Sequence, residues 1–311
     1  MRGGKMKPVV LLYESIHPDG LAVLKEKAEV RYAPGWSEEE VLPIIGDVAG
    51  IIIRANGQIT RRLMENAPCL KVVGRHGVGL DNVDVAAATE LGITVVNTPE
   101  ANAEAVAEHT LGLMIALSKR IGEGDRALRA GNWDARYTLI GHELRGCTLG
   151  VIGCGRIGSR VAHMAHAAFD MQVVYHDVIA YPKLEAELGA ERVELEKLLR
   201  RSDVVTLHVP LTPATQGLIG EKELALMKPT AFLINTSRGP VVDEAALVEA
   251  LRSGQIAGAG LDVYSTEPLP ADSPLLSMEN VLFTPHMAAH TEEALRNMSL
   301  VAEDIIAVLE G

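Results

Sequence analysis

Short apolar runs, many of them β-branched, alternate with helical patterns along most of the chain. In the first part of the sequence, the apolar runs fall at residues 8–14, 50–54, 70–74 and 93–97, and helical patterns separate them. Strands that are covered on both faces of a parallel sheet have nearly continuous apolar sequences, and helices usually form the crossovers between them. The pattern therefore predicts an α/β unit with a parallel sheet.

A second series of strands follows a long helical pattern over residues 103–120. Its six predicted strands cover residues 148–152, 172–177, 204–209, 231–235, 258–263 and 280–284. Six strands with helices between them are typical of a complete doubly wound sheet. A final helical pattern, over residues 292–309, is too short to form a domain alone, so we expect this helix to pack on the first unit.

The two series predict two doubly wound parallel-sheet domains. One consists of residues 1–100 together with residues 287–311, and the other consists of residues 101–286. The second domain is thus expected to be an insertion within the first, with two connections between them.

Composition and charge exclude several classes of function. The chain has 29 Lys and Arg residues against 41 Asp and Glu residues, a formal net charge of −12, and no block of basic residues. Nucleic-acid binding requires a basic face that displaces counterions from phosphates, so no nucleic-acid partner is expected. No apolar run is long enough for a signal-peptide core or a membrane span, so we expect a cytoplasmic protein without a membrane partner. Three unclustered cysteines predict reduced thiols and no disulfide framework.

A glycine-rich turn follows the first strand of the second series. Gly153, Gly155 and Gly158 form a Gly-x-Gly-x-x-Gly pattern between this strand and a helical pattern. The first glycine permits a tight turn, the second lets the backbone approach a pyrophosphate, and the third lets the helix pack closely on the strand. The helix N-terminus then favours the negative charge of the phosphates. The turn therefore predicts a dinucleotide site.

Asp177 ends the next strand, 19 residues after Gly158. A carboxylate at this position can accept hydrogen bonds from both hydroxyl groups of an adenosine ribose. The residues that follow, Val178, Ile179 and Ala180, include no arginine to pair with a 2′-phosphate, and the charge of Asp177 would repel one. The sequence therefore predicts NAD rather than NADP as the cofactor.

Three polar residues, Arg238, Glu267 and His286, stand directly after strands of the second series, at the edge where ligands of doubly wound sheets bind. Here the sequence resembles the D-2-hydroxyacid dehydrogenase family, and within it the 3-phosphoglycerate dehydrogenase-like branch. The segments that carry the resemblance include the glycine turn and residues 74–84, 97–99, 208–213, 235–240, 261–270 and 283–288.

The resemblance implies a Rossmann NAD domain inserted into a flavodoxin-like substrate domain, a homodimer, and a set of site residues. Arg238, Glu267 and His286 match the catalytic residues of the family, and Asp262 matches the residue that holds the nicotinamide carboxamide. The expected cofactor-binding residues are Gly153, Gly155, Arg156, Ile157, Gly158, Asp177, Val209, Pro210, Thr236, Ser237, Asp262 and Ala288. The expected substrate-binding residues are Arg54, Arg75, His76, Gly77, Val78 and Gly79.

The chemistry of 2-keto acid reduction explains why these residue types suit the task. Hydride transfer to C2 leaves negative charge on the oxygen, and an imidazole such as that of His286 can donate the proton, or accept it in the reverse direction. Glu267 would orient the imidazole ring, and Arg238 offers a planar fork for a carboxylate. We expect no metal, because no ligand set completes coordination by His163 and His166, which lie one helical turn apart.

The substrate is expected to be 3-phosphoglycerate or a similar anionic 2-hydroxy acid. Arg54, Arg75 and Arg136 are the candidate cations for a second anionic group, while His76 departs from the alanine usual in that branch. Hydroxypyruvate, glyoxylate and sulfolactate-type substrates stay open, and so does an NADH-sensing corepressor-like binding protein. We expect no regulatory amino-acid-binding domain of the kind that longer members carry after the last helix.

The predicted homodimer has a candidate face on the helix over residues 103–120. Leu111, Leu113, Met114, Ile115 and Leu117 give this helix more apolar surface than one domain is expected to bury. A helix buried entirely within its own domain is the alternative.

Overall fold

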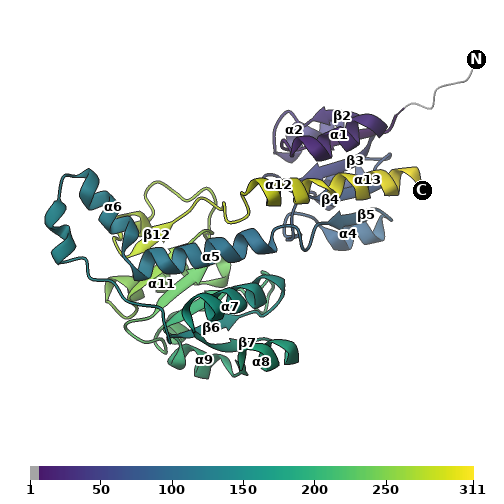
Figure 1. Cartoon of the computed structure of the whole chain (residues 1–311). Coiled ribbons are helices and arrows are strands. Elements are labelled where there is room, and N and C mark those ends of the chain that lie inside the picture. The colour runs from purple at the N-terminus through teal and green to yellow at the C-terminus, as the bar shows by residue number, and fades with distance from the viewer. Residues whose placement is uncertain (1–6) are drawn as a thin grey trace, which may run out of the picture. The chain divides into compact units, whose positions relative to one another are not determined.

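The computed structural model describes residues 7–311, so the first six residues of the predicted first domain lie outside it. The chain folds into two compact units (Figure 1). Unit 1 contains the chain up to Asn102 together with His290–Gly311, and unit 2 contains Ala103–Ala289. Both boundaries lie a few residues beyond those expected from the sequence.

Unit 1 contains a five-stranded parallel sheet in the order β2-β1-β3-β4-β5, which is the strand order of flavodoxin-like folds. Its strands are β1 (Val9–Leu12), β2 (Glu29–Tyr32), β3 (Val48–Ile53), β4 (Val72–Arg75) and β5 (Thr94–Asn97). Its helices are α1 (Pro18–Lys27), α2 (Glu38–Val41), α3 (Arg61–Glu65), α4 (Val85–Glu90), α12 (Glu292–Ser299) and α13 (Val301–Glu310). The pattern of apolar runs did not predict β2, because this edge strand is mostly exposed and lacks a continuous apolar run.

The two faces of the unit 1 sheet bury alternate residues of each strand. On β1, Val9 and Leu11 belong to one apolar cluster, whereas Val10 and Leu12 belong to the cluster on the opposite face. Ile305 of α13 packs in the second cluster, and its side chain lies so close to Gly74 that a Cβ there would be 2.9 Å from its Cδ1. The C-terminal segment therefore returns to unit 1, as expected.

This C-terminal segment differs in detail from the single helix that the sequence predicts. It forms two helices, α12 and α13, which meet at Leu300. The Leu300 N–H donates to the carbonyl of Asn297, a tight three-residue turn that replaces the ordinary four-residue helical hydrogen bond. Figure 1 shows both helices, in yellow, beside the strands of unit 1.

Unit 2 contains a seven-stranded parallel sheet in the order β12-β11-β10-β9-β6-β7-β8. Its strands are β6 (Thr148–Ile152), β7 (Gln172–His176), β8 (Glu191–Arg192), β9 (Val204–Leu207), β10 (Phe232–Asn235), β11 (Gly258–Leu261) and β12 (Val281–Phe283). Its helices are α5 (Ala103–Ser118), α6 (Ile121–Arg129), α7 (Arg156–Phe169), α8 (Pro182–Leu188), α9 (Leu195–Arg201), α10 (Glu221–Leu224) and α11 (Glu244–Arg252). From β8 through β6 to β11, the order is that of the Rossmann fold, and β12 is added at one edge.

The six strands predicted for this unit are all present, but they are not the six strands of the nucleotide fold. The third strand of that fold is β8, which has only two residues, both exposed, and so has no apolar pattern to predict it. The last predicted strand is β12, which extends the sheet beyond the sixth position.

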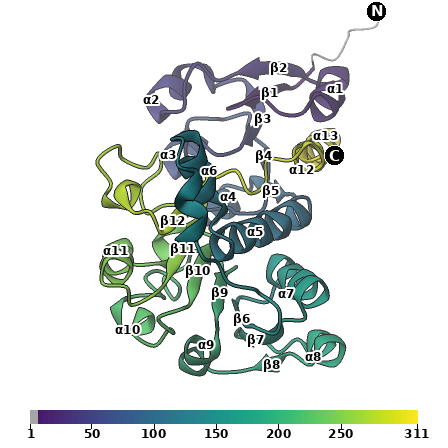
Figure 2. The same cartoon turned by 60° about the vertical axis from the view of Figure 1, so that its left-hand side comes forward.

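The long helix α5 is a core element of unit 2. Leu113 and Met114 are buried, and Leu111, Ile115 and Leu117 pack partly buried against the same apolar cluster. α5 lies beside α7 and also contacts β10 and β11 (Figure 2). Leu113 and Met114 are therefore core residues of unit 2, while Leu111, Ile115 and Leu117 keep part of their surface exposed, and the dimer face on this helix stays a prediction. Among the described residues, no helix has both the length and the apolar composition to cross a membrane.

Candidate functional site

The glycine turn of unit 2 has the form that a pyrophosphate requires. Gly153 has a φ of +88°, and a Cβ there would lie 2.7 Å from the carbonyl oxygen of His208. A Cβ at Gly158 would lie 2.0 Å from the carbonyl oxygen of Gly153, so only glycine fits at this position in the first turn of α7. By contrast, a Cβ at Gly155 would meet no atom within 4 Å. This open space at the start of α7 fits a phosphate, which the helix N-terminus favours.

Asp177 ties the end of β7 to the glycine turn. Its two carboxylate oxygens accept hydrogen bonds from the backbone N–H of Cys154 at 2.7 Å and of Ile179 at 3.1 Å. The Cys154 thiol is buried beneath the turn, and burial, with the charge of Asp177, raises its pKa to about 12. This cysteine therefore stays protonated and has a packing role.

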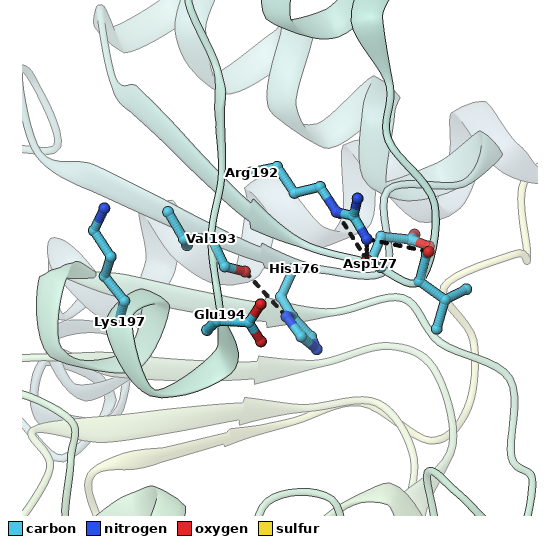
Figure 3. Close-up of a pocket in the computed structure, with 7 residues that line it drawn as sticks. His176, Asp177, Arg192, Val193, Glu194 and Lys197 are labelled. Atoms are coloured by element: carbon cyan, nitrogen blue, oxygen red, sulfur yellow. Dashed lines mark hydrogen bonds between the residues drawn. The ribbon is translucent and has the colours of Figure 1, made fainter.

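A pocket of about 590 Å³ lies beside Asp177 (Figure 3). Its apolar lining comes from Val178 and Val193, and its polar lining includes Arg192. The guanidinium of Arg192 donates to the backbone carbonyls of Asp177 at 2.8 Å and Val178 at 3.1 Å, so it holds the end of β7 in place. A pocket with apolar sides next to a ribose-binding carboxylate could hold the adenine of a dinucleotide.

The other residues expected around the cofactor lie at the same edge of the unit 2 sheet or just behind it. Arg156 and Ile157 form the first turn of α7, and Ile157 packs into the core. Val209 lies against the glycine turn, since a Cβ on Gly153 would be 2.8 Å from its Cγ1. The carbonyl of Pro210 accepts a hydrogen bond from the hydroxyl of Thr215.

His286 and Glu267 form a hydrogen-bonded pair. Nδ1 of His286 lies 2.7 Å from Oε2 of Glu267, and Oε1 of the same carboxylate accepts the backbone N–H of Tyr264 at 3.0 Å. His286 has a φ of +49°, an unusual conformation for a residue other than glycine, and its N–H donates to the carbonyl of Asp262. Such strained residues occur often at functional sites, where the surrounding contacts hold them.

The charges around Glu267 favour its ionised form. Partial burial acts to raise the pKa of Glu267, but the hydrogen bond and charge of His286 outweigh this effect, with help from the Tyr264 N–H and the charge of Arg238. The pKa of Glu267 therefore lies below its ordinary value. Arg238, Glu267 and His286 follow the parallel strands β10, β11 and β12, so all three segments leave the sheet of unit 2 at its carboxyl edge.

Arg238 belongs to a rigid loop after β10. The side chain of Asn235 accepts hydrogen bonds from the backbone N–H and hydroxyl of Ser237, and it donates to the carbonyl of Arg238. The hydroxyl of the buried Thr236 lies 3.0 Å from that of Thr110 on α5. These hydrogen bonds fix the backbone that carries the guanidinium.

Asp262 is a buried carboxylate, only 1% exposed. It accepts hydrogen bonds from the backbone N–H groups of Met287 at 2.8 Å and Ala288 at 2.9 Å, and from the hydroxyl of Thr284 at 2.6 Å. Three donors offset the cost of burying the charge. The sequence predicts Asp262 and Ala288 as cofactor-binding residues, and the structure joins them by a hydrogen bond.

The residues expected to bind substrate belong to unit 1. Nη2 of Arg54 lies 2.8 Å from Nε2 of His290. Arg75 donates from Nη1 to the carbonyl of His76. The fold of unit 1 brings His290 beside Arg54, which lies 236 positions earlier in the chain.

His76 is enclosed, whereas the sequence predicts a donor that faces the substrate. Its imidazole is only 1% exposed, and neither ring nitrogen has a hydrogen-bond partner among the described residues. Burial and the charge of Arg54 lower the pKa of His76 to about 4, so the ring is neutral at pH 7. The reason for the difference is local, because His76 continues the buried strand β4 and its backbone N–H still bonds to β3.

The loop of Gly77, Val78 and Gly79 is held by the segment that follows β5. The N–H of Gly77 donates to the hydroxyl of Thr98 at 3.1 Å, and the side chain of Asn97 donates to the carbonyl of Val78 at 2.8 Å. Gly77 has a φ of +131°, a conformation that side chains rarely adopt. The loop thus has a defined backbone that could receive a carboxylate.

The remaining candidate residues, Arg136, His163 and His166, interact with groups near them in unit 2. In unit 2, the guanidinium of Arg136 stacks over the rings of Trp133 and Tyr137. His163 pairs with Glu187 at 3.4 Å, and His166 bonds to the carbonyl of Met171 at 3.0 Å. Within residues 7–311, no group of three or more His, Cys, Asp or Glu side chains has an arrangement suited to a metal ion.

Comparisons with known proteins find relatives over nearly the whole chain. Residues 111–288 match the model of the D-isomer specific 2-hydroxyacid dehydrogenase NAD-binding domain. The chain is 45% identical to the D-3-phosphoglycerate dehydrogenase of Methanocaldococcus jannaschii over 97% of its own length and 57% of that protein. It is 42% identical to the glyoxylate reductase of Korarchaeum cryptofilum over 98% of its own length and 94% of that protein.

Solved structures include a close match as well. The TT0316 protein from Thermus thermophilus is 40% identical, with a TM-score of 0.91 over 97% of both chains. The chain therefore matches proteins of one family over nearly its whole length, although it spans little more than half of the D-3-phosphoglycerate dehydrogenase from M. jannaschii.

Proposed function

Because this chain belongs to the D-isomer specific 2-hydroxyacid dehydrogenase family, we propose that it interconverts an anionic 2-keto acid and the D-2-hydroxy acid with NAD(H). The cofactor, when bound, supplies or accepts the hydride, and the side chains of this protein handle the proton and bind the acid. The observation that carries the proposal is the 2.7 Å pairing of His286 with Glu267 in the unit that also contains the glycine turn.

His286 exchanges the proton of the oxygen on C2. Glu267 engages Nδ1, which leaves Nε2 of the ring for the substrate. During reduction, Nε2 donates its proton to the keto oxygen, and during oxidation it accepts the proton of the hydroxyl group. The carboxylate of Glu267 stabilises the protonated ring, and the lowered pKa of Glu267 keeps this carboxylate ionised at neutral pH.

Arg238 binds the negatively charged part of the substrate beside this pair. Its guanidinium offers parallel N–H donors, which match the two oxygens of a carboxylate better than the ammonium of a lysine would. Arg238 thereby orients C2 toward the proton donor.

NAD is the proposed cofactor in preference to NADP. The carboxylate of Asp177 suits the hydroxyl groups of the adenosine ribose and repels a 2′-phosphate. The backbone N–H groups at the glycine turn suit the pyrophosphate, and the buried carboxylate of Asp262 suits the amide of the nicotinamide ring. Turnover with NADH should therefore exceed turnover with NADPH.

The substrate is proposed to have a second anionic group, as 3-phosphoglycerate does. Arg54, Arg75 and His290 support this choice, because they bring cationic and hydrogen-bonding groups together in unit 1 of an acidic protein. Relatives named D-3-phosphoglycerate dehydrogenase also support it.

Reduction of glyoxylate or hydroxypyruvate is the second candidate. The hydrogen bond between Arg54 and His290 favours it, since this contact occupies one guanidinium nitrogen that a phosphate would otherwise use. The match to a glyoxylate reductase over 94% of that protein favours it as well. A sulfonated acid lies between the two candidates in charge.

A homodimer is part of the proposal, with its contact on the segment that we call the 121–140 patch. Five large apolar side chains of this segment are between 52% and 72% exposed: Ile121, Leu128, Trp133, Tyr137 and Ile140. No residue of α6 is buried in the described chain. Exposed apolar residues gathered on one segment are typical of an interface between subunits.

Steady-state kinetics with a panel of acids tests the proposed function. We expect NADH oxidation with 3-phosphohydroxypyruvate, sulfopyruvate, hydroxypyruvate, glyoxylate and pyruvate to decrease roughly in the order of substrate charge. His286→Ala should lower kcat by about 10²- to 10⁴-fold, the usual contribution of a general acid. Arg54→Ala should raise KM for the phosphorylated and sulfonated acids only.

The control for these variants is NADH binding, which His286→Ala should preserve. A wild-type protein that binds NADH but reduces none of the five acids would refute the enzyme assignment. Equal losses of Arg54→Ala on pyruvate and on 3-phosphohydroxypyruvate would refute the role of Arg54 and favour glyoxylate or hydroxypyruvate as the substrate.

A further inference from the structure

His109 on α5 is connected to the buried carboxylate of Asp262 through one hydroxyl group. Nε2 of His109 lies 3.0 Å from Oγ1 of Thr284, and this hydroxyl lies 2.6 Å from Oδ1 of Asp262. The imidazole itself is 3.8 Å from Oδ1, too far for a direct hydrogen bond. All three residues belong to unit 2.

The direction of these hydrogen bonds follows from the number of protons available. A carboxylate only accepts hydrogen bonds, so Thr284 must use its single hydroxyl proton for Asp262. The oxygen of Thr284 can then only accept from His109, which means that Nε2 of the imidazole carries a proton. Both the neutral Nε2–H form and the charged form of histidine meet this requirement.

The same contacts determine which hydrogen bonds the carboxylate of Asp262 can still accept. Oδ1 accepts from the Thr284 hydroxyl and from the N–H of Met287, while Oδ2 accepts only the N–H of Ala288 among the described residues. Each carboxylate oxygen can accept about two hydrogen bonds. Oδ2 therefore has room for one further donor, and the orientation of the carboxylate decides where that donor must lie.

We propose that His109 is a positioning residue for the cofactor: it fixes the Thr284 hydroxyl, which in turn holds Asp262 in the orientation that accepts the nicotinamide amide. This inference rests on the proposed function only for the identity of the ligand, because the hydrogen bonds exist in the protein alone. Without the donor from His109, the Thr284 hydroxyl loses the contact that orients it, and its hydrogen bond to Oδ1 of Asp262 becomes less well fixed.

A purely structural role is the alternative to test. His109 could serve only to tie α5 to the segment after β12, and its loss would then lower stability without a specific effect on the cofactor. His166 provides a matched comparison, because it lies partly exposed on α7 of the same unit and makes one hydrogen bond of 3.0 Å, to the carbonyl of Met171. His166 contacts none of the proposed site residues in the described structure.

The experiment measures the Kd of NADH by fluorescence and the Tm of the cofactor-free protein for four single variants and one double variant. His109→Leu should weaken NADH binding about five- to tenfold, the effect of losing one hydrogen bond. His109→Gln, which keeps an N–H donor, should restore Kd to within about twofold of the wild type. His166→Leu should lower Tm to a similar degree as His109→Leu but leave the Kd of NADH unchanged.

The fourth variant tests the path through the hydroxyl group. Thr284→Val should weaken NADH binding as much as His109→Leu, and the double variant should be no worse than either single variant, because both changes break one chain of hydrogen bonds. Additive losses would show that His109 acts independently of Thr284 and would overturn the proposal. An unchanged Kd in His109→Leu, or a failure of His109→Gln to restore it, would also overturn it.

These outcomes can be distinguished from a failure of the proposed function. A wild-type protein that binds NADH but reduces no 2-keto acid contradicts the proposed function, and the NADH affinities of the variants still decide the role of His109. At saturating NADH, the KM for the acid should change by less than about twofold in His109→Leu, since the lost hydrogen bond lies on the cofactor side.

Discussion

At the scale of single residues, Asp262 and His76 show two ways in which a protein accommodates a buried ionisable side chain. Both side chains are only 1% exposed. Asp262 has three hydrogen-bond donors, which make a buried charge tolerable, whereas His76 has no partner for either ring nitrogen among the described residues. At His76 the cost of burying a charge is avoided because its lowered pKa keeps the ring neutral, although the two ring nitrogens still lose their hydration.

The neutral His76 predicts a loss of stability in acid. Its pKa is about 4 in the folded protein and about 6.5 in an unfolded chain, so below pH 6.5 the unfolded chain binds a proton that the folded protein does not. The free energy of unfolding is therefore unaffected by His76 above pH 6.5. As the pH decreases toward 4, the protonation of His76 in the unfolded chain lowers this free energy by roughly 3 kcal/mol. Denaturant unfolding of the wild type and His76→Leu between pH 7 and pH 4.5 measures the difference.

His76→Leu should remove this part of the pH dependence, whatever its effect on stability at pH 7. The other histidines are unchanged in the variant, so they serve as the internal control for acid effects elsewhere in the chain. Parallel stability curves for the two proteins over this pH range would contradict the burial of a neutral imidazole at position 76.

At the scale of elements, the turn between β6 and α7 combines two glycines that are needed for different reasons. Gly158 is required by the protein itself, because a side chain there would collide with the carbonyl of Gly153. We propose that Gly155 is required by the ligand, because the space around it is open in the protein alone. The same chemical change at the two positions should therefore have opposite consequences for folding and binding.

We expect Gly155→Ala to fold with a Tm close to that of the wild type and to bind NADH at least tenfold more weakly, since the methyl group would enter the space for the pyrophosphate. Gly158→Ala should lower the free energy of unfolding by about 1–3 kcal/mol, the usual cost of overpacking. Differential scanning fluorimetry and NADH titration measure the two effects.

Gly112→Ala on α5 is the matched control for both variants. A Cβ there meets no atom within 4 Å, and alanine is a better helix former than glycine, so Tm should rise slightly. If Gly155→Ala bound NADH as tightly as this control, the glycine turn would not be the pyrophosphate site.

At the scale of the whole molecule, two surfaces are candidates for the dimer contact. The sequence predicts the helix over residues 103–120, whereas the exposure of side chains in the structure favours the 121–140 patch. On α5, Leu113 and Met114 lie in the core of unit 2, and Leu111, Ile115 and Leu117 are partly buried against the same core. The 121–140 patch, by contrast, exposes five large apolar side chains. The homodimer that we propose should therefore depend on this patch and not on α5.

Trp133→Glu should convert the dimer to a monomer, because a charge placed in an apolar interface loses its hydration without gaining a partner. Light scattering coupled to size-exclusion chromatography measures the mass of each variant. Trp36→Glu is the control, since Trp36 is 54% exposed in unit 1 and lies outside the patch. A dimer that survives Trp133→Glu together with Leu128→Glu would contradict the proposed interface.

The sequence by itself determined the fold class and the positions of most strands. Parallel strands covered on both faces need continuous apolar runs, and such runs are visible without any tertiary information, as at Val48–Ile53 and Thr148–Ile152. The glycine turn was predictable for a similar reason, because it depends on local backbone geometry. The exposed edge strands β2 and β8 lacked this signal and were missed.

Only the tertiary structure decided which side chains share a hydrogen bond and which are covered. His290 reaches Arg54 across 236 positions, and His109 reaches Thr284 across 175 positions, and neither contact leaves a pattern in the sequence. Burial is decided in the same way, since Leu113 and Met114 of α5 are covered and His76 is enclosed only when the other elements pack around them. Local periodicity reflects the average environment of a segment, whereas these contacts depend on where the rest of the chain lies.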